Sequence, residues 1–208
     1  MIKKYQLTER ELNLLWDEAI FISHVNDNKG FRQDEHGQWI RRSEFGNPNS
    51  EPQLHFLCGK IASGKSTLAK TLSQQPRTIL LCEDEWLSAL YPNEIKELSD
   101  YIEKSALVKK VLEKHIQHLV AAGNTVVMDF PANTPTQRQW LKSLAQSSGA
   151  SYVFHVLNVD NQKCKARLAA RNLTGENPFQ TSEAQFDLIT AHFSYPDSSE
   201  QLVCKFYW

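Results

Sequence analysis

The chain has 208 residues, of which 41% are hydrophobic and 23% are charged. This length corresponds to between one and two average domains, and the composition is that of a globular protein rather than a disordered or collagen-like chain. The 23 basic and 24 acidic residues leave a formal charge of -1. This balance excludes a global positive field of the kind that binds long polyanions, but it allows a local phosphate site.

The sequence lacks the signals of membrane insertion and secretion. No stretch approaches the ~18 consecutive apolar residues of a membrane span, and the start of the chain turns polar where a signal peptide would be apolar. The four cysteines form no CxxC pair, and three of them lie in apolar runs, which favours reduced core thiols over a disulfide or a zinc site. We therefore expect a cytoplasmic protein with no membrane partner.

Residues 1–51 are expected to form an N-terminal extension of a helix and a polar loop. Residues 8–11 (TERE) match a capping box, and apolar residues at helical spacing follow them to about His24, which predicts a helix. Polar and turn-forming residues dominate from Asn26 to Pro52. This second stretch is expected to be a long loop or a loose hairpin.

From Pro52 onward, short apolar runs alternate with helical stretches, a pattern that is typical of a parallel β-sheet covered by helices. Residues 52–208 are therefore assigned to one α/β domain. Five strands are predicted in it, at residues 54–58, 78–82, 125–130, 152–159 and 202–208. The helices predicted between them are at residues 65–73, 99–122, 135–147 and 161–172.

The first predicted strand of this domain leads directly into a phosphate-binding motif. Residues 59–66 (GKIASGKS) satisfy GxxxxGK[ST], and helical residues follow them. Glycines let consecutive N–H groups point at phosphate oxygens, and the helix adds its positive N-terminal end. A chance Gly-rich turn is the alternative, but the strand and helix that the motif requires are both present.

The motif predicts that a nucleoside triphosphate binds here together with Mg²⁺. Lys65 would bridge the β- and γ-phosphates, and the Ser66 hydroxyl would ligate the metal. The residues expected to contact the nucleotide are Gly59, Lys60, Ile61, Ala62, Ser63, Gly64, Lys65, Ser66 and Thr67.

Acidic residues follow the second and third predicted strands of the domain. Glu83, Asp84 and Glu85 lie where a doubly wound sheet presents its strand ends to ligands. One of these carboxylates can accept the proton of a substrate hydroxyl during phosphoryl transfer, or Asp84 or Glu85 can merely cap the next helix. Asp129 follows the apolar residues of the third predicted strand, as expected of a carboxylate that holds Mg²⁺ directly or through water. The alternative is that Asp129 is a loop acid with no role in metal binding.

The predicted helix at residues 161–172 carries four basic side chains. Arg167 and Arg171 are four residues apart and therefore share a helix face. From that face they could close over a triphosphate and offset the charge of the transferring group. A solvated basic face is the ordinary alternative, and it is the interpretation that we prefer for Lys163 and Lys165.

Taken together, these segments resemble the small P-loop kinases, a group that includes polynucleotide 5'-kinase domains, chloramphenicol phosphotransferase and zeta-toxin-like sugar-nucleotide kinases. Four segments match in order: FLCGKIASGKSTLAKTL, LCEDEWLSALYP, VVMDFPANTPTQRQWLKSLA and LNVDNQKCKARLAARN. The resemblance begins at about Pro52. It implies an α/β P-loop NTPase fold, in which a five-stranded parallel sheet of order 2-3-1-4-5 has helices on both faces.

The resemblance also implies roles for individual residues. It makes Asp84 the general base for the acceptor hydroxyl, and Arg171 the lid arginine with Arg167 as the second choice. Polynucleotide kinases carry a further arginine shortly after the base, where this sequence has Leu87. This departure and the charge of -1 disfavour nucleic acid as a partner.

The sequence therefore predicts an ATP- and Mg²⁺-dependent phosphotransferase that acts on a hydroxyl of a small molecule. The predicted catalytic residues are Lys65, Asp84, Arg167 and Arg171, and the predicted metal ligands are Ser66 and Asp129. Two alternatives stay open: a nucleotide-binding NTPase or switch module with a protein partner, and a nucleic-acid 5'-end kinase. The stretch from Trp86 to Lys104 is expected to build most of the substrate pocket, and its composition defines no readable specificity.

Overall fold

The computed structural model describes residues 31–33, 39–41, 51–174 and 181–208. The chain divides into two units, residues 1–49 and 50–208, which are described separately. In the first unit, β1 (Phe31–Gln33) pairs in antiparallel fashion with β2 (Trp39–Arg41). This hairpin lies in the stretch for which a loop or a loose hairpin is predicted. The helix predicted before it lies outside the described residues, and the domain boundary after residue 51 stays a prediction.

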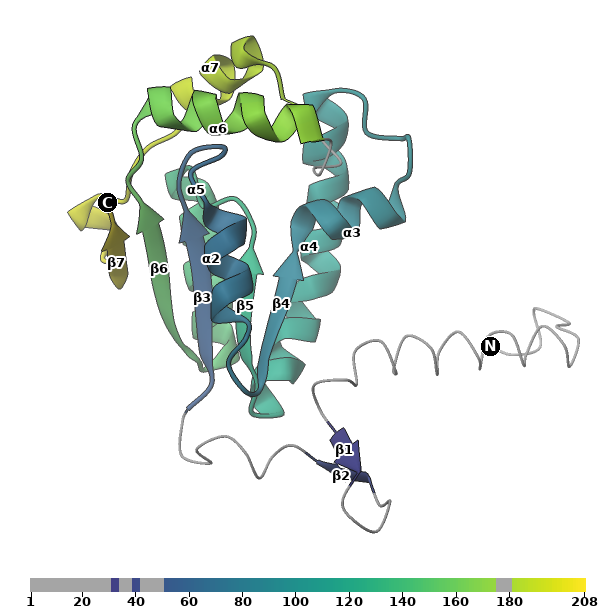
Figure 1. Ribbon diagram of the computed structural model, residues 1–208. Helices are drawn as coiled ribbons and strands as arrows, with labels where there is room; N and C mark the ends of the chain where they lie inside the picture. The colour runs from purple at the N-terminus through teal and green to yellow at the C-terminus, as the bar shows by residue number, and fades with distance from the viewer. Residues whose placement is uncertain (1–30, 34–38, 42–50, 175–180) are drawn as a thin grey trace, which may run out of the picture. The chain divides into compact units, whose positions relative to one another are not determined.

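The second unit is built on a five-stranded parallel sheet (Figure 1). In chain order its strands are β3 (Gln53–Cys58), β4 (Thr78–Cys82), β5 (Thr125–Asp129), β6 (Ser151–Leu157) and β7 (Cys204–Tyr207). Their order across the sheet is β4-β5-β3-β6-β7, and each neighbouring pair is parallel. In terms of the five predicted strands this order is 2-3-1-4-5, so the prediction of the fold is confirmed.

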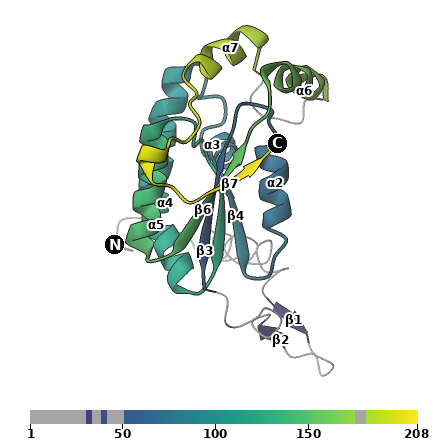
Figure 2. The same ribbon diagram turned by 90° about the vertical axis from the view of Figure 1, so that its left-hand side faces the viewer.

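Helices cover both faces of the sheet, as predicted (Figure 2). One face is covered by α2 (Lys65–Leu72), and the other by α4 (Leu98–Ala121) and α5 (Pro135–Ser148). The remaining helices are α3 (Glu83–Leu90), α6 (Asn161–Thr174), α7 (Glu183–Ala191) and the short 3₁₀ helix η3 (Ser198–Glu200). In Figure 1, α6 and α7 cross above the carboxyl ends of the strands. No helix in the described ranges is both long and apolar enough to span a membrane.

The apolar runs of the strands reflect this two-sided cover. In β3, Leu54 and Phe56 pack in the layer between the sheet and α4 and α5, whereas Leu57 packs with Ala69 of α2. All four side chains are fully buried. A strand that is buried on both faces loses the alternation of a half-exposed strand, and it reads as a continuous apolar run.

The start of α5 follows from its sequence. The Thr134 hydroxyl accepts a hydrogen bond from the backbone N–H of Gln137 at 3.2 Å, and the Gln137 side chain accepts one from the Thr134 N–H at 3.2 Å. Pro135 occupies the first helical turn, where its missing N–H costs nothing. The capping signals therefore locate this helix start correctly.

Among the described residues, the helices α3 and α7 and the short η3 are absent from the sequence prediction. The first begins directly after β4, with three acidic residues in its first turn, where negative charge is favourable at a helix N-terminus. Its eight residues carry too short an apolar pattern to be separated from a loop. The last strand is also shorter than predicted, because Leu202 and Val203 precede β7 rather than belong to it.

Arg138 of α5 is the largest of the fully buried side chains. Its Nε and Nη2 donate to the two carboxylate oxygens of Glu200, each at 2.8 Å, and its Nη1 donates to the backbone oxygen of Ser194 at 2.8 Å. This ion pair holds the segment after α7 against α5, and it lowers the pKa of Glu200. The segment is thereby fixed before the chain returns to the sheet as β7.

Candidate active site

The loop between β3 and α2 curls tightly at the carboxyl end of the sheet. Ala62 and Gly64 adopt left-handed backbone conformations, with φ of 58° and 106°, and the Ser63 N–H donates to the Lys60 carbonyl at 3.2 Å. A Cβ atom on Gly59 would lie 2.6 Å from the Ser63 hydroxyl oxygen. A larger residue at position 59 would therefore have to displace the Ser63 side chain.

The predicted phosphate-site lysine lies inside this loop. Lys65 Nζ donates to the backbone oxygens of Gly59 at 2.7 Å and Lys60 at 2.9 Å. Burial lowers the pKa of Lys65, and the carboxylates of Asp129 and Asp84 oppose this shift. The loop therefore surrounds a cation that faces two acids.

The first turn of α2 adds N–H donors to the loop. The first backbone hydrogen bond of this helix runs from the Leu68 N–H to the Gly64 oxygen, at 3.1 Å. The N–H groups of Lys65, Ser66 and Thr67 therefore have no acceptor inside the helix. Ser66 and Thr67 are also exposed, so this turn can donate hydrogen bonds to an anion.

The two predicted acids lie at the carboxyl ends of two neighbouring strands, β4 and β5. Asp129 ends β5 directly opposite Cys82, the last residue of β4, and Asp84 follows in the first turn of α3. Burial raises the pKa of Asp84, and the negative charges of Glu83 and Asp129 add to this shift, whereas Lys65 opposes it. The structure thus brings Lys65, Asp84 and Asp129 together from α2, α3 and β5.

Glu83, which the sequence prediction did not distinguish from its neighbours, is almost fully buried beside Asp84. Its side chain is 1% exposed, and it accepts hydrogen bonds from the Tyr101 hydroxyl at 2.7 Å and the Ser105 hydroxyl at 2.6 Å. Lys109 Nζ lies 3.3 Å from Glu83 Oε1. The three donors lie at intervals of four in α4 and therefore share one helix face. This spacing indicates a polar contact of the helix, but it does not identify Glu83 as the partner.

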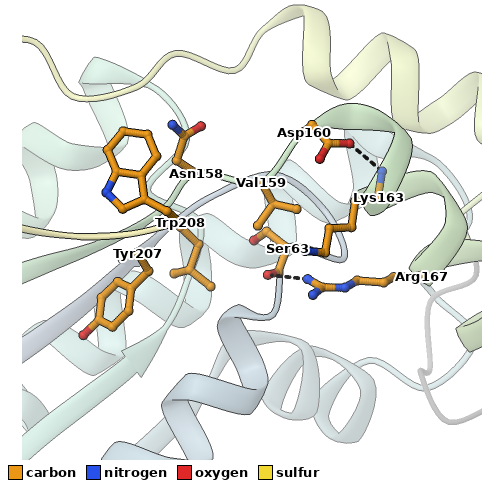
Figure 3. A pocket seen from close by; sticks show the side chains of 9 residues that line it. Ser63, Asn158, Val159, Asp160, Lys163, Arg167, Tyr207 and Trp208 are labelled. Atoms are coloured by element: carbon orange, nitrogen blue, oxygen red, sulfur yellow. Dashed lines mark hydrogen bonds between the residues drawn. The ribbon is translucent and has the colours of Figure 1, made fainter.

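A pocket of about 240 Å³ opens beside the loop (Figure 3). Its residues come from four places: the loop, the end of β6 with the residues that follow it, α6, and the carboxyl end of β7. They are Ser63, Leu157, Asn158, Val159, Asp160, Lys163, Arg167, Tyr207 and Trp208. No local pattern in the sequence predicts this pocket, because segments that lie far apart in the chain form it.

Of the two predicted lid arginines, Arg167 contacts the loop. Its Nη1 donates to the Ser63 backbone oxygen at 3.0 Å, the contact drawn in Figure 3. Arg171 lies one turn further along α6 and is half-buried. Lys165, for which a solvated basic face is preferred, forms solvent-exposed ion pairs with Glu183 at 2.9 Å and Asp187 at 2.8 Å on α7.

The donor set fits Mg²⁺ better than a metal held entirely by side chains. Within the described ranges, no three His, Cys, Asp or Glu side chains are grouped to hold a metal ion. The Ser66 hydroxyl and the Asp129 carboxylate are oxygen donors, as Mg²⁺ prefers, and this ion usually keeps several waters and binds few protein groups.

The fold and the curled loop define a protein of the P-loop kinase class. A family model described as an AAA domain matches residues 54–196, which is more than half of the chain. The chain belongs to this family, whose members are P-loop kinases. No curated protein sequence matches the chain.

Several solved structures share this fold. One is the APS kinase CysC of Mycobacterium tuberculosis in complex with AMPPNP and APS, at TM-score 0.51 and 17% identity, covering 75% of this chain and 88% of that chain. Another is Kti12 of Chaetomium thermophilum in complex with ADP-AlF3, at TM-score 0.57 and 12% identity, covering 75% and 88%. At these identities the likeness establishes the shared fold.

A third neighbour belongs to a larger assembly. A chain of the Pnkp1/Rnl/Hen1 RNA repair complex matches at TM-score 0.56 and 17% identity over 70% of this chain. This chain spans only 45% of the length of that one. The match therefore concerns one domain of a longer protein.

Proposed function

We propose that the protein is an ATP-dependent phosphotransferase that moves the γ-phosphoryl group to a hydroxyl of a small molecule. The observation that carries this proposal is the position of Lys65 Nζ, which lies inside the phosphate loop with the carboxylates of Asp84 and Asp129 acting on it. A cation beside a phosphate cradle and a carboxylate that can accept a proton are the two groups that phosphoryl transfer needs from a protein.

The nucleotide would lie across the loop and the neighbouring pocket. Residues 59–67 would bind its phosphates through the loop and the free N–H groups of α2. Its base would enter the pocket of about 240 Å³ next to Tyr207 and Trp208, where aromatic rings can stack on a flat ring system. APS kinase and Kti12, which share the fold, were solved in complex with AMPPNP and ADP-AlF3, which supports a nucleotide as the ligand of this chain.

Ser66 and Asp129 would hold Mg²⁺, Asp129 through water or directly. When bound, this ion supplies positive charge that neutralises the phosphate oxygens. The other cationic groups belong to the chain itself: Lys65 inside the loop, and Arg167 and Arg171 on α6. They would offset the charge that spreads over the transferring group.

Asp84 would receive the proton of the acceptor hydroxyl. The acceptor oxygen forms a bond to the γ-phosphorus while the bond from that phosphorus to the β–γ bridging oxygen breaks, and ADP is the product that leaves. The raised pKa of Asp84 makes this carboxylate a stronger base than a solvated one. Because the transition state is loose, holding the two substrates in line contributes most of the acceleration.

A small acceptor is favoured over a nucleic-acid end. Leu87, which stands where polynucleotide kinases have an arginine, is fully buried in the core. The first turns of α3 therefore offer no cation to a nucleic-acid phosphate. The half-buried rings of Trp86 and Tyr91, on and just after α3, instead provide apolar contact for a small molecule.

The proposal is tested by measuring ADP release against a panel of hydroxyl metabolites, nucleosides, antibiotics and a 5'-hydroxyl oligonucleotide. We expect one small acceptor to accelerate ADP release, and Lys65→Ala to abolish that release without unfolding the protein. Lys70→Ala, which removes an exposed lysine of the same helix, is the matched control and should retain activity.

Three results would contradict the proposal in different ways. Undiminished turnover by folded Lys65→Ala would reject the phosphate loop as the site. Acceleration by the oligonucleotide alone, with salt-sensitive affinity, would identify an end kinase. Turnover that no acceptor changes but a protein partner does would identify a nucleotide-dependent switch.

A further inference from the structure

The carboxylate of Glu83 has no part in the proposed transfer, although it lies next to the proposed base. Glu83 is the first residue of α3 and is only 1% exposed. Removing a carboxylate from water is costly unless partners replace its hydration. Its partners all come from one face of α4.

Three donors from successive turns of α4 occupy both oxygens of this carboxylate. The Tyr101 hydroxyl donates to Oε2 at 2.7 Å, and the Ser105 hydroxyl donates to Oε1 at 2.6 Å. Lys109 Nζ lies 3.3 Å from Oε1 and neutralises the charge. This arrangement fixes the start of α3 against α4.

Tyr101 joins this anchor to Asp84. Its hydroxyl, 2.7 Å from Glu83 Oε2, also lies 3.3 Å from Asp84 Oδ1. Burial and the two carboxylates raise the pKa of Tyr101, so the hydroxyl keeps its single proton. This proton is donated to Glu83 at the shorter distance and is shared with Asp84 as a bifurcated hydrogen bond. The Tyr101 hydroxyl contacts Oδ1 of Asp84, and Oδ2 is the oxygen that would meet an acceptor hydroxyl.

We propose that Glu83 and Tyr101 are positioning residues, and that the buried Glu83 carboxylate holds the Tyr101 hydroxyl where it fixes the Asp84 carboxylate for proton transfer. This inference rests on the proposed function for the role of Asp84 as base. The geometric link between Glu83, Tyr101 and Asp84 does not depend on which acceptor the protein uses.

The electrostatics of the site give the two residues opposite effects on Asp84. The groups that act on it are Glu83 from α3, Asp129 from β5, Tyr101 from α4 and Lys65 from α2. The charge of Glu83 raises the pKa of Asp84, whereas the hydrogen bond from Tyr101 lowers it. Removing the Tyr101 hydroxyl should therefore raise the pKa of Asp84, and removing the Glu83 charge should lower it.

The first experiment needs no phosphoryl transfer. Carbon-13 NMR of protein labelled at the aspartate carboxyl carbons follows the titration of Asp84, whose signal is assigned by its loss in Asp84→Asn. We expect the Asp84 pKa to rise in Tyr101→Phe and to fall in Glu83→Gln, each by about half a pH unit or more. Tyr152→Phe and Glu85→Gln are matched controls, because Tyr152 lies on β6 and Glu85 is exposed to solvent, and both should leave it nearly unchanged.

Shifts of the same sign in both variants, or no shift in Tyr101→Phe, would overturn the proposal. Should Glu83→Gln fail to fold, Tyr101→Phe decides the matter alone, because it deletes one oxygen and keeps the ring. These results stand whether or not an acceptor is found, so failure of the positioning role is distinguishable from failure of the proposed function.

The second experiment measures transfer in a double-mutant cycle. Tyr101→Phe should lower kcat by about 10- to 100-fold and leave KM for ATP unchanged. In the Asp84→Asn background the same substitution should cost nothing further, because its effect passes through the carboxylate. An equal loss in both backgrounds would show a purely structural role and would overturn the proposal.

Discussion

Asp84 has a raised pKa and lies near the phosphate loop. We therefore expect the removal of its charge to slow phosphoryl transfer strongly. Asp84→Asn keeps the size of the side chain and removes the base. General-base catalysis is worth ~10² to 10⁴ in rate, so kcat should fall in that range while KM for ATP is unchanged. Steady-state kinetics of ADP release with the best acceptor measures both constants.

Glu85→Gln is the control for this substitution, because Glu85 is the next residue and is exposed. It should transfer phosphate at nearly the rate of the unaltered protein. A result in which Asp84→Asn is active, while Glu85→Gln or Asp129→Asn is inactive, would assign the base to another acid.

The two arginines of α6 should differ in the kinetic constant that they affect. Arg167 lines the pocket and contacts the Ser63 carbonyl, so Arg167→Ala should raise KM for ATP in addition to lowering kcat. Arg171→Ala should lower kcat more than it weakens ATP binding, as expected of a charge that matters most during transfer. Measuring kcat and KM in both variants tests this difference between the two arginines. An effect of Arg171→Ala on KM alone would show that Arg171 does not act on the transferring phosphoryl group.

At the scale of elements, three neighbouring strands are joined by a chain of polar side chains. His55 Nδ1 lies 2.9 Å from His155 Nε2, and His155 Nδ1 lies 2.7 Å from the Tyr207 hydroxyl. His155 is only 3% exposed. Burial, with smaller contributions from His55 and Lys205, lowers the pKa of His155 to about 4.

This depressed pKa predicts how stability depends on pH. Between about pH 6.5 and pH 4 the unfolded chain binds a proton at His155 that the folded protein excludes, so the free energy of unfolding falls as the pH is lowered through this window. The contribution is at most about 3 kcal/mol. Urea unfolding at pH 7, 6 and 5 should show this loss, and His155→Gln should show a smaller one.

His118→Gln serves as the control, because His118 is exposed on α4. It should leave the pH dependence of unfolding nearly as it is in the unaltered protein. A pH dependence that stays unchanged in His155→Gln would assign the loss to other groups.

At the scale of the whole second unit, residues 50–208, the Arg138–Glu200 ion pair connects α5 with the segment that leads into β7. Breaking one partner of a buried pair leaves the other charge uncompensated, which costs about 3–5 kcal/mol. Arg138→Met should therefore lower the free energy of unfolding by that amount, as measured by urea denaturation. Lys142→Met, which removes a single hydrogen bond to the Glu200 carbonyl, should cost about 1 kcal/mol.

Equal losses in these two variants would mean that the buried charge itself contributes little. A large loss in Arg138→Met alone would identify the ion pair as the main tie of the C-terminal segment.

Local patterns in the sequence predicted the phosphate loop, the start of α5 and the strands of the sheet, because each of these depends on a short stretch of chain. The phosphate loop follows from a motif in which Gly64 permits a left-handed turn at the start of α2, and the start of α5 follows from a capping box. The strand order across the sheet came from the resemblance to P-loop kinases, since no local pattern encodes which strands are neighbours. The apolar runs predicted the strands because both faces of the sheet are covered.

Only the tertiary structure decided which distant residues meet. The buried Glu83 carboxylate is stabilised by donors on α4. The pocket beside the loop is lined by residues from four segments, and Arg138 pairs with a glutamate 62 residues later in the chain. A buried charge or hydroxyl must find a partner wherever the fold supplies one. Such pairings satisfy a requirement of the whole packed molecule, and no short pattern in the sequence records them.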